Sequence, residues 1–198
     1  MDIIIYLRDL NNEVVRAWSN EFRGYSNIKI SKGNIFDIKA DAIISPANSF
    51  GFMDGGIDLD YSYYFGWNLQ KELQKKICKD YYGELPVGMA TMVETNNEDI
   101  KFLVSCPTMR IPEIISNTAN AYLAFRAALI EVLSFNDNNE SQKIKSILCP
   151  GLGTLTGGIL PENCARQMRF AYDKIINAEP EFPANLSIAG RNHNELIG

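Results

Sequence analysis

The stretch GNIFDIKADAIISPANSFGFMDGGID, residues 33–58, decides how this chain folds. It contains a short continuous apolar run at 42–45, which is typical of a strand covered on both faces. The loop PANS at 46–49 ends that run, and a segment with helical spacing follows the glycine pair at 55–56. A strand, a loop and a helix in this order form the repeating unit of an α/β protein.

The same order recurs in SILCPGLGTLTGGILP, residues 146–161, where four glycines fall within the eight residues 151–158. Glycine adopts positive φ and lets backbone N–H groups turn towards a ligand, and the start of a helix adds the positive end of its dipole. With the hydroxyls of Thr154 and Thr156, this loop can hold a diphosphate without any Lys or Arg. The alternative is a glycine-rich turn that serves only tight packing.

Two known phosphate motifs fit this loop poorly. A Walker A loop is excluded because no Gly-Lys-Ser/Thr follows the glycines. A dinucleotide-binding fingerprint fits only partially: Gly151, Gly153 and Gly157 follow a strand, but the last spacing is one residue too long. No second strand–helix unit with a ribose-binding acid remains downstream, which argues against hydride transfer.

The rest of the chain alternates between strand and helix patterns. Apolar runs typical of strands lie at 3–7, 28–30, 42–45, 89–95, 101–106 and 145–149. Helical spacing lies between or after them, at 11–21, 59–78, 117–133 and 161–176. This alternation predicts an α/β fold, a three-layer α/β/α sandwich with a mixed, mostly parallel central sheet. The runs at 89–95 and 101–106 are expected to form an antiparallel pair joined by the polar turn at 96–99.

Length and composition bound the number of domains. The 198 residues are 46% apolar and 22% charged, as in ordinary globular proteins, so we expect a single domain over residues 1–198. Residues 179–198 contain two prolines and little periodicity. We therefore expect them to form a surface tail that wraps the domain or frays.

The net charge of −5 argues against an extended nucleic-acid surface, because neutralising phosphates requires clustered Lys and Arg. The longest basic run is Lys75-Lys76. An anionic ligand would therefore have to be held by local backbone amides.

The cysteines and the single histidine suggest no metal centre. The four cysteines match no zinc spacing and His193 is the one histidine, so we expect no metal and no cofactor. Cys106 and Cys149 end apolar runs and are expected to be reduced core residues. The start of the chain lacks the features of a signal peptide, and no stretch approaches the roughly 18 apolar residues of a membrane span. We expect a cytoplasmic protein with no membrane partner.

Several polar side chains follow the predicted strands. Asn48 can hydrogen-bond the vicinal hydroxyls of a sugar, or alternatively form an Asx turn. Asp58 falls at the start of the next helix, where a helix cap is the alternative role. Thr108 and Arg110 follow the run at 101–106 and should reach the same edge of the sheet. Arg110 is expected either to face a phosphate or to make a surface ion pair.

These stretches resemble the macro domain family. Residues 33–58 are similar to its pattern of Gly-Asp-Ile, a strand ending in Asn-Ala-Ala-Asn, and a glycine run closing in Val-Asp. The string CPGLGTLTGGILPENCARQM, residues 149–168, resembles the second loop and the following helix of that family. The resemblance covers roughly residues 28–176 and implies a cleft for ADP-ribose or an ADP-ribosylated substrate.

The resemblance also implies roles for individual residues. Asn34 would meet the adenine amine, Asn48 would contact the distal ribose, and Asp58 would orient or deprotonate the attacking water. The catalytic residues would thus be Asn48 and Asp58. The expected ligand-binding residues are Asn34, Ile35, Ala47, Gly55, Gly56, Ile57, Thr108, Gly151, Gly153, Thr154, Leu155, Thr156, Gly157 and Ile159.

This chain departs from the family pattern at several positions. Asn34 replaces the usual Asp and loses the charge-assisted part of a bond to the adenine amine. Ser45 replaces the first Asn of the strand end, and Ile159 replaces an aromatic residue beside the distal ribose. The first loop carries extra aromatic residues, of which Phe52 is a candidate to cover the ligand.

From these features we predict a metal-independent hydrolase that cleaves an ADP-ribosyl linkage or a small ADP-ribose derivative by water attack at the distal ribose. One alternative is a non-catalytic module that binds ADP-ribose or a related nucleotide, which Asn34 and Ile159 favour. Another is a phosphatase acting on ADP-ribose 1″-phosphate in the same cleft.

Overall fold

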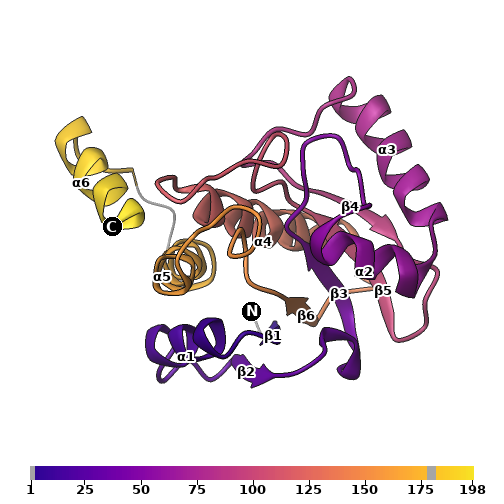
Figure 1. Cartoon of the computed structure of the whole chain (residues 1–198), viewed down its shortest axis with the longest axis horizontal. Helices are drawn as coiled ribbons and strands as arrows, with labels where there is room; N and C mark the ends of the chain where they lie inside the picture. Colours follow the sequence, from indigo (N-terminus) through magenta and orange to yellow (C-terminus); the bar gives the residue numbers. More distant parts are fainter. Residues whose placement is uncertain (1–2, 178–181) are drawn as a thin grey trace.

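The computed structural model describes residues 3–177 and 182–198. Its centre is a six-stranded sheet in the order β2-β1-β6-β3-β5-β4 (Figure 1). The strands are β1 (Ile4–Asp9), β2 (Ile28–Lys32), β3 (Ala40–Ser45), β4 (Thr91–Glu94), β5 (Ile100–Ser105) and β6 (Ser146–Cys149). β4 runs antiparallel to β5, and the other pairings are parallel. The mixed, mostly parallel sheet expected from the sequence is confirmed, and so is its antiparallel pair.

Helices cover both faces of the sheet (Figure 1). One face packs against α1 (Asn12–Glu21), α4 (Asn120–Asn138) and α5 (Pro161–Tyr172), and the other against α2 (Gly56–Phe65) and α3 (Asn68–Tyr81). The three-layer α/β/α architecture is therefore confirmed. In the described part of the chain, no helix combines the length and the apolar content needed to cross a membrane.

β3 lies inside the sheet and is covered by helices on both faces, so its side chains have to be apolar on both sides. Its successive side chains point to opposite faces, so Ala42 and Ile44 pack on the α4 side while Ile43 packs on the side of α2 and α3. Ile43, Ile44 and Ala42 are all completely buried. Cys106 and Cys149 are likewise buried and free, as the sequence predicts.

The single helix expected over 59–78 is instead two helices, α2 and α3. Gly66 ends α2 with φ 90° and ψ 149°, a backbone conformation that is essentially restricted to glycine. Its N–H donates to the carbonyl of Ser62 at 3.0 Å and caps the helix. The helical spacing continues across this break because both helices place apolar residues on the same side of the sheet.

The C-terminal segment, expected over 179–198 to form a surface tail, contains a helix. Residues 179–181 lie outside the described residues, and the chain then forms α6 (Leu186–Ile197). Asn185 caps this helix, its side chain accepting from the N–H of Ile188 at 3.0 Å. α6 packs on α5, where the Gln167 amide donates to the carbonyl of Leu196 at 2.9 Å. Leu196 is the one residue of α6 that is buried, so this helix lies mostly on the surface.

We expect Gly66→Ala to lower the free energy of unfolding by about 2 kcal/mol, because a Cβ is strained at this φ and ψ. A Cβ at Gly66 would have no atom within 4 Å, so crowding adds nothing to this cost. Gly190→Ala is the matched control, since it also has open space but lies inside α6, where alanine is favoured over glycine. Urea denaturation of both variants checks the prediction, and equal stabilities would contradict it.

Candidate functional site

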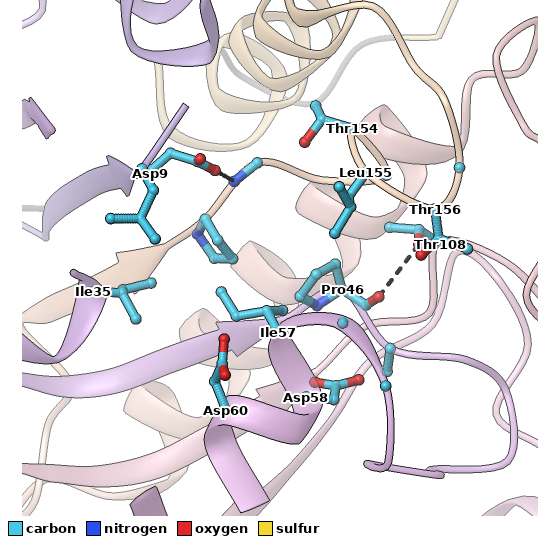
Figure 2. A pocket seen from close by; sticks show the side chains of 18 of the residues that line it. Asp9, Ile35, Pro46, Ile57, Asp58, Asp60, Thr108, Thr154, Leu155 and Thr156 are labelled. Atoms are coloured by element: carbon cyan, nitrogen blue, oxygen red, sulfur yellow. Dashed lines mark hydrogen bonds between the residues drawn. The ribbon is translucent and has the colours of Figure 1, made fainter. Parts of the chain in front are cut away.

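A cleft of about 1140 Å³ lies at the edge of the sheet where the parallel strands end. Its walls come from the end of β1 and the residues that follow β1, β2, β3, β5 and β6, together with one face of α2 (Figure 2). Ligands of α/β proteins bind outside the carboxyl ends of the strands, and this volume suits a dinucleotide-sized molecule.

The cleft brings together nearly all the residues singled out in the sequence. Those that line it are Asn34, Ile35, Ala47, Asn48, Gly55, Gly56, Ile57, Asp58, Thr108, Gly151, Gly153, Thr154, Leu155, Thr156 and Gly157. Ile159 is not among the lining residues. It is 1% exposed and packs behind the second loop, where a Cβ on Gly153 would lie 3.0 Å from its Cδ1 atom.

The second glycine loop, residues 150–158, is held in place from behind. The N–H of Ile159 donates to the carbonyl of Gly153 at 3.0 Å, and the N–H of Ile115 donates to that of Gly157 at 2.8 Å. Gly153 has φ 68°, and a Cβ on Gly157 would lie 2.6 Å from Ile115. Both glycines are therefore required by the conformation of this loop or by its packing.

Gly151 lines the cleft, but its N–H already has a partner. It donates to Oδ2 of Asp9 at 3.0 Å, the contact drawn as a dashed line in Figure 2. Oδ1 of Asp9 accepts from the N–H of Asn11 at 2.8 Å. An anionic ligand would therefore find free N–H donors later in the loop, because the N–H of Gly151 already donates to Asp9.

Asn48 organises the first loop. Its Oδ1 accepts from the N–H groups of Phe50 at 3.1 Å and Phe52 at 3.3 Å, and its Nδ2 donates to the carbonyl of Phe52 at 2.8 Å. These contacts agree with the alternative role predicted for Asn48, that of a turn-forming residue. Asn48 also lines the cleft. Phe52 is 52% exposed at the rim.

Asp58 is a buried acid and not the N-cap of α2. The cap is Gly55, which places Asp58 in the first turn of the helix. The residue is 6% exposed, and its carboxylate accepts a hydrogen bond from Ser45 Oγ at 2.6 Å. Burial raises the pKa of Asp58 from 3.8 to about 7, and the Ser45 hydrogen bond lowers this pKa by a smaller amount. Asp58 therefore titrates much closer to neutral pH than an exposed aspartate does.

Arg110 points away from the cleft. Its Nε and Nη2 contact the Glu84 carboxylate at 2.7 and 3.0 Å, and its guanidinium lies 4.9 Å from the ring centroid of Phe50. Arg110 therefore makes an ion pair with Glu84, which is one of the two roles expected for it from the sequence.

Arg8 and Asp9 line the cleft although the sequence analysis did not single them out. They end β1, which pairs with β6, so their position follows from the strand order. Arg8 donates through Nε to the carbonyl of Asn34 at 2.7 Å and through its other nitrogens to Ser31 and Asp37, both at 2.8 Å. The sequence feature that could have indicated these two residues is their position directly after the apolar run at 3–7.

The charges of the cleft are mostly negative. Among the described lining residues, the acids are Asp9, Asp54, Asp58 and Asp60, and the one cationic side chain is Arg8. An anion bound here would have to rely on the N–H groups of the two glycine loops and on the N-terminus of α2. Within residues 3–177 and 182–198, no group of three or more His, Cys, Asp or Glu side chains is placed to hold a metal ion.

Solved structures share this fold at low sequence identity. The macrodomain of Mycobacterium tuberculosis DarG matches with a TM-score of 0.61 and 21% identity over 75% of this chain and 91% of that chain. Thermosipho africanus DarTG in complex with ADP-ribose matches with a TM-score of 0.57 and 16% identity over 87% of this chain and 51% of that chain.

Sequence comparison agrees with the structural similarity. An uncharacterised protein of Aquifex aeolicus is 32% identical over 155 residues, which are 78% of this chain and 84% of that protein. The family model described as "Macro domain" matches residues 44–168, which include both glycine loops and α2. The chain belongs to the macro domain family.

Proposed function

We propose that this protein binds ADP-ribose in the cleft and hydrolyses an ADP-ribosyl linkage or a small ADP-ribose derivative. The observation that carries the proposal is the buried Asp58 carboxylate, which has a pKa near 7 and lies between two glycine loops. The family membership and a neighbour that holds ADP-ribose support the choice of ligand.

The two glycine loops would bind the diphosphate. Residues 153–157 present backbone N–H groups and two threonine hydroxyls, and Gly55 and Gly56 begin α2 with the positive end of its dipole towards the cleft. Because these donors belong to the backbone, the four acids that line the cleft do not prevent the phosphates from binding there. The distal ribose would then lie against Ala47 and Asn48 at the end of β3.

Asp58 would act as a general base at the distal ribose. A water oxygen attacks the anomeric carbon, the bond from that carbon to the leaving oxygen breaks, and the water proton passes to the Asp58 carboxylate. The proton then passes to the leaving group, so the products are ADP-ribose and the free acceptor. A base with a pKa near the working pH suits this task.

A binding module without turnover is the second candidate function. It is favoured by the position of Ile159, which packs behind the second loop and leaves the cleft without the aromatic residue that the family commonly places beside the distal ribose. Turnover measurements separate the two candidates.

Titration calorimetry should detect ADP-ribose binding whose affinity stays constant or rises between about 0.05 and 0.5 M salt, because screening weakens the repulsion from the cleft acids. Gly157→Ala should weaken binding about tenfold, since its Cβ would displace the loop. Gly190→Ala, far from the cleft, should bind as the wild type does. A lack of binding at about 1 mM ADP-ribose would rule out the proposed ligand.

Asp58→Asn should stabilise the protein, and more so at higher pH. The folded-state pKa of Asp58 is about 7 against an ordinary 3.8, so the stability of the wild type falls as the pH rises through this window. The variant should therefore gain about 4 kcal/mol near pH 8 and clearly less near pH 5. Urea denaturation at both pH values measures the two gains, and equal gains would contradict the burial of an ionisable acid.

The pH dependence of turnover should change when the hydrogen bond from Ser45 to Asp58 is removed. Hydrolysis of a mono-ADP-ribosylated protein should rise through about pH 7, and Ser45→Ala should move this rise to higher pH because Asp58 loses its hydrogen-bond donor. Ser105→Ala is the matched control: Ser105 is as buried and lies in register beside Ser45, but its hydroxyl has no partner in the described residues.

Undiminished turnover by Asp58→Ala would remove Asp58 from the mechanism.

A further inference from the structure

The cleft has two ends of different chemistry. The glycine loops supply backbone donors at one end, whereas the end that follows β2 is lined by Ile35, Phe36 and Tyr64. Phe36 and Tyr64 stack face to face with their ring centroids 4.0 Å apart. A nucleoside diphosphate therefore has a preferred direction in this cleft, with its phosphates at the loops and its base at the apolar end.

Asp60 brings a carboxylate to the apolar end. It follows Ile57 by three residues and precedes Tyr64 by four, which places all three on one face of α2, and all three line the cleft. In Figure 2 its carboxylate points up from α2 towards Ile35 and Ile57. Its side chain is exposed, and it makes no ion pair within the described parts of the chain.

The neighbouring polar groups are already engaged. Oδ1 of Asn34 accepts from the N–H of Phe36 at 3.1 Å and caps the short 3₁₀ helix Ile35–Asp37. The guanidinium of Arg8 is held by Ser31, Asp37 and the carbonyl of Asn34. Asp60, by contrast, makes no side-chain hydrogen bond and no ion pair within residues 3–177 and 182–198, so both of its carboxylate oxygens can accept from a ligand.

We propose that the Asp60 carboxylate determines the base specificity of the cleft, by accepting a hydrogen bond from the exocyclic amine of the bound purine. This inference rests on the proposed binding of ADP-ribose. An ionised carboxylate offers only acceptors, so it pairs with the 6-amino group of adenine and opposes the 6-oxo group of hypoxanthine. The selecting acid lies on α2, and Asn34, in the loop after β2, keeps its role as a helix cap.

The test compares ADP-ribose with its hypoxanthine analogue by titration calorimetry on the full chain. The wild type should bind ADP-ribose at least about tenfold more tightly, as expected for a lost hydrogen bond to a charged group. In Asp60→Asn the preference should fall to within about twofold, because a rotatable amide can either accept from an amine or donate to an oxo group.

Asp54→Asn is the matched control. Asp54 is an exposed acid that also lines the cleft, so this variant changes the charge equally. It should keep the tenfold preference, while any gain from reduced repulsion should be the same for both ligands.

The outcomes separate this inference from the function on which it rests. Wild-type binding of ADP-ribose without a preference would overturn the role of Asp60 alone. The role of Asp60 would also be overturned if Asp60→Asn keeps the preference, or if this variant loses affinity for both ligands to the same extent. A wild type that binds neither ligand would overturn the proposed function together with the inference.

Discussion

The parallel pairing of β3 with β5 and β6 is the constraint on which the site depends. Ser45 lies in register with Ser105 of β5, and Ile43 with Leu148 of β6. Because these strands run in the same direction as β1 and β2, their carboxyl ends meet at one edge. Loops that are about a hundred residues apart in the chain, at 46–58 and 150–158, therefore form opposite walls of one cleft.

The same pairing decides what surrounds Asp58. The alternation along β3 turns Ser45 towards α2, where its hydroxyl is the one side-chain donor among the described residues that reaches the Asp58 carboxylate. One hydrogen bond offsets only part of the cost of burying a charge, so the pKa of Asp58 stays well above that of an exposed aspartate. An acid held in this state lowers the stability of the fold, and such perturbed groups occur most often at functional sites.

The cleft differs in chemistry along its length, with the glycine loops in one part and Ile35, Phe36 and Tyr64 in another. The glycine loops supply backbone N–H groups, and the acids come from the end of β1, from the first loop and from the first half of α2. A protein of net charge −5 can bind a diphosphate in this way because the donors are fixed by the backbone and need no cationic side chain. In the proposed complex, the acids would face the neutral parts of the ligand, namely the sugars and the base.

The sequence by itself determined the strands, the two glycine loops, the antiparallel pair at β4 and β5 and the three-layer fold, because apolar periodicity and glycine φ preferences act over a few residues. Tertiary structure alone decided which side chains share the cleft. Asp9 meets Gly151 across 142 residues, Asp58 becomes a buried acid, and Arg110 turns outward to Glu84. These outcomes depend on strand order and burial, which arise from contacts between distant segments and leave no local pattern in the chain.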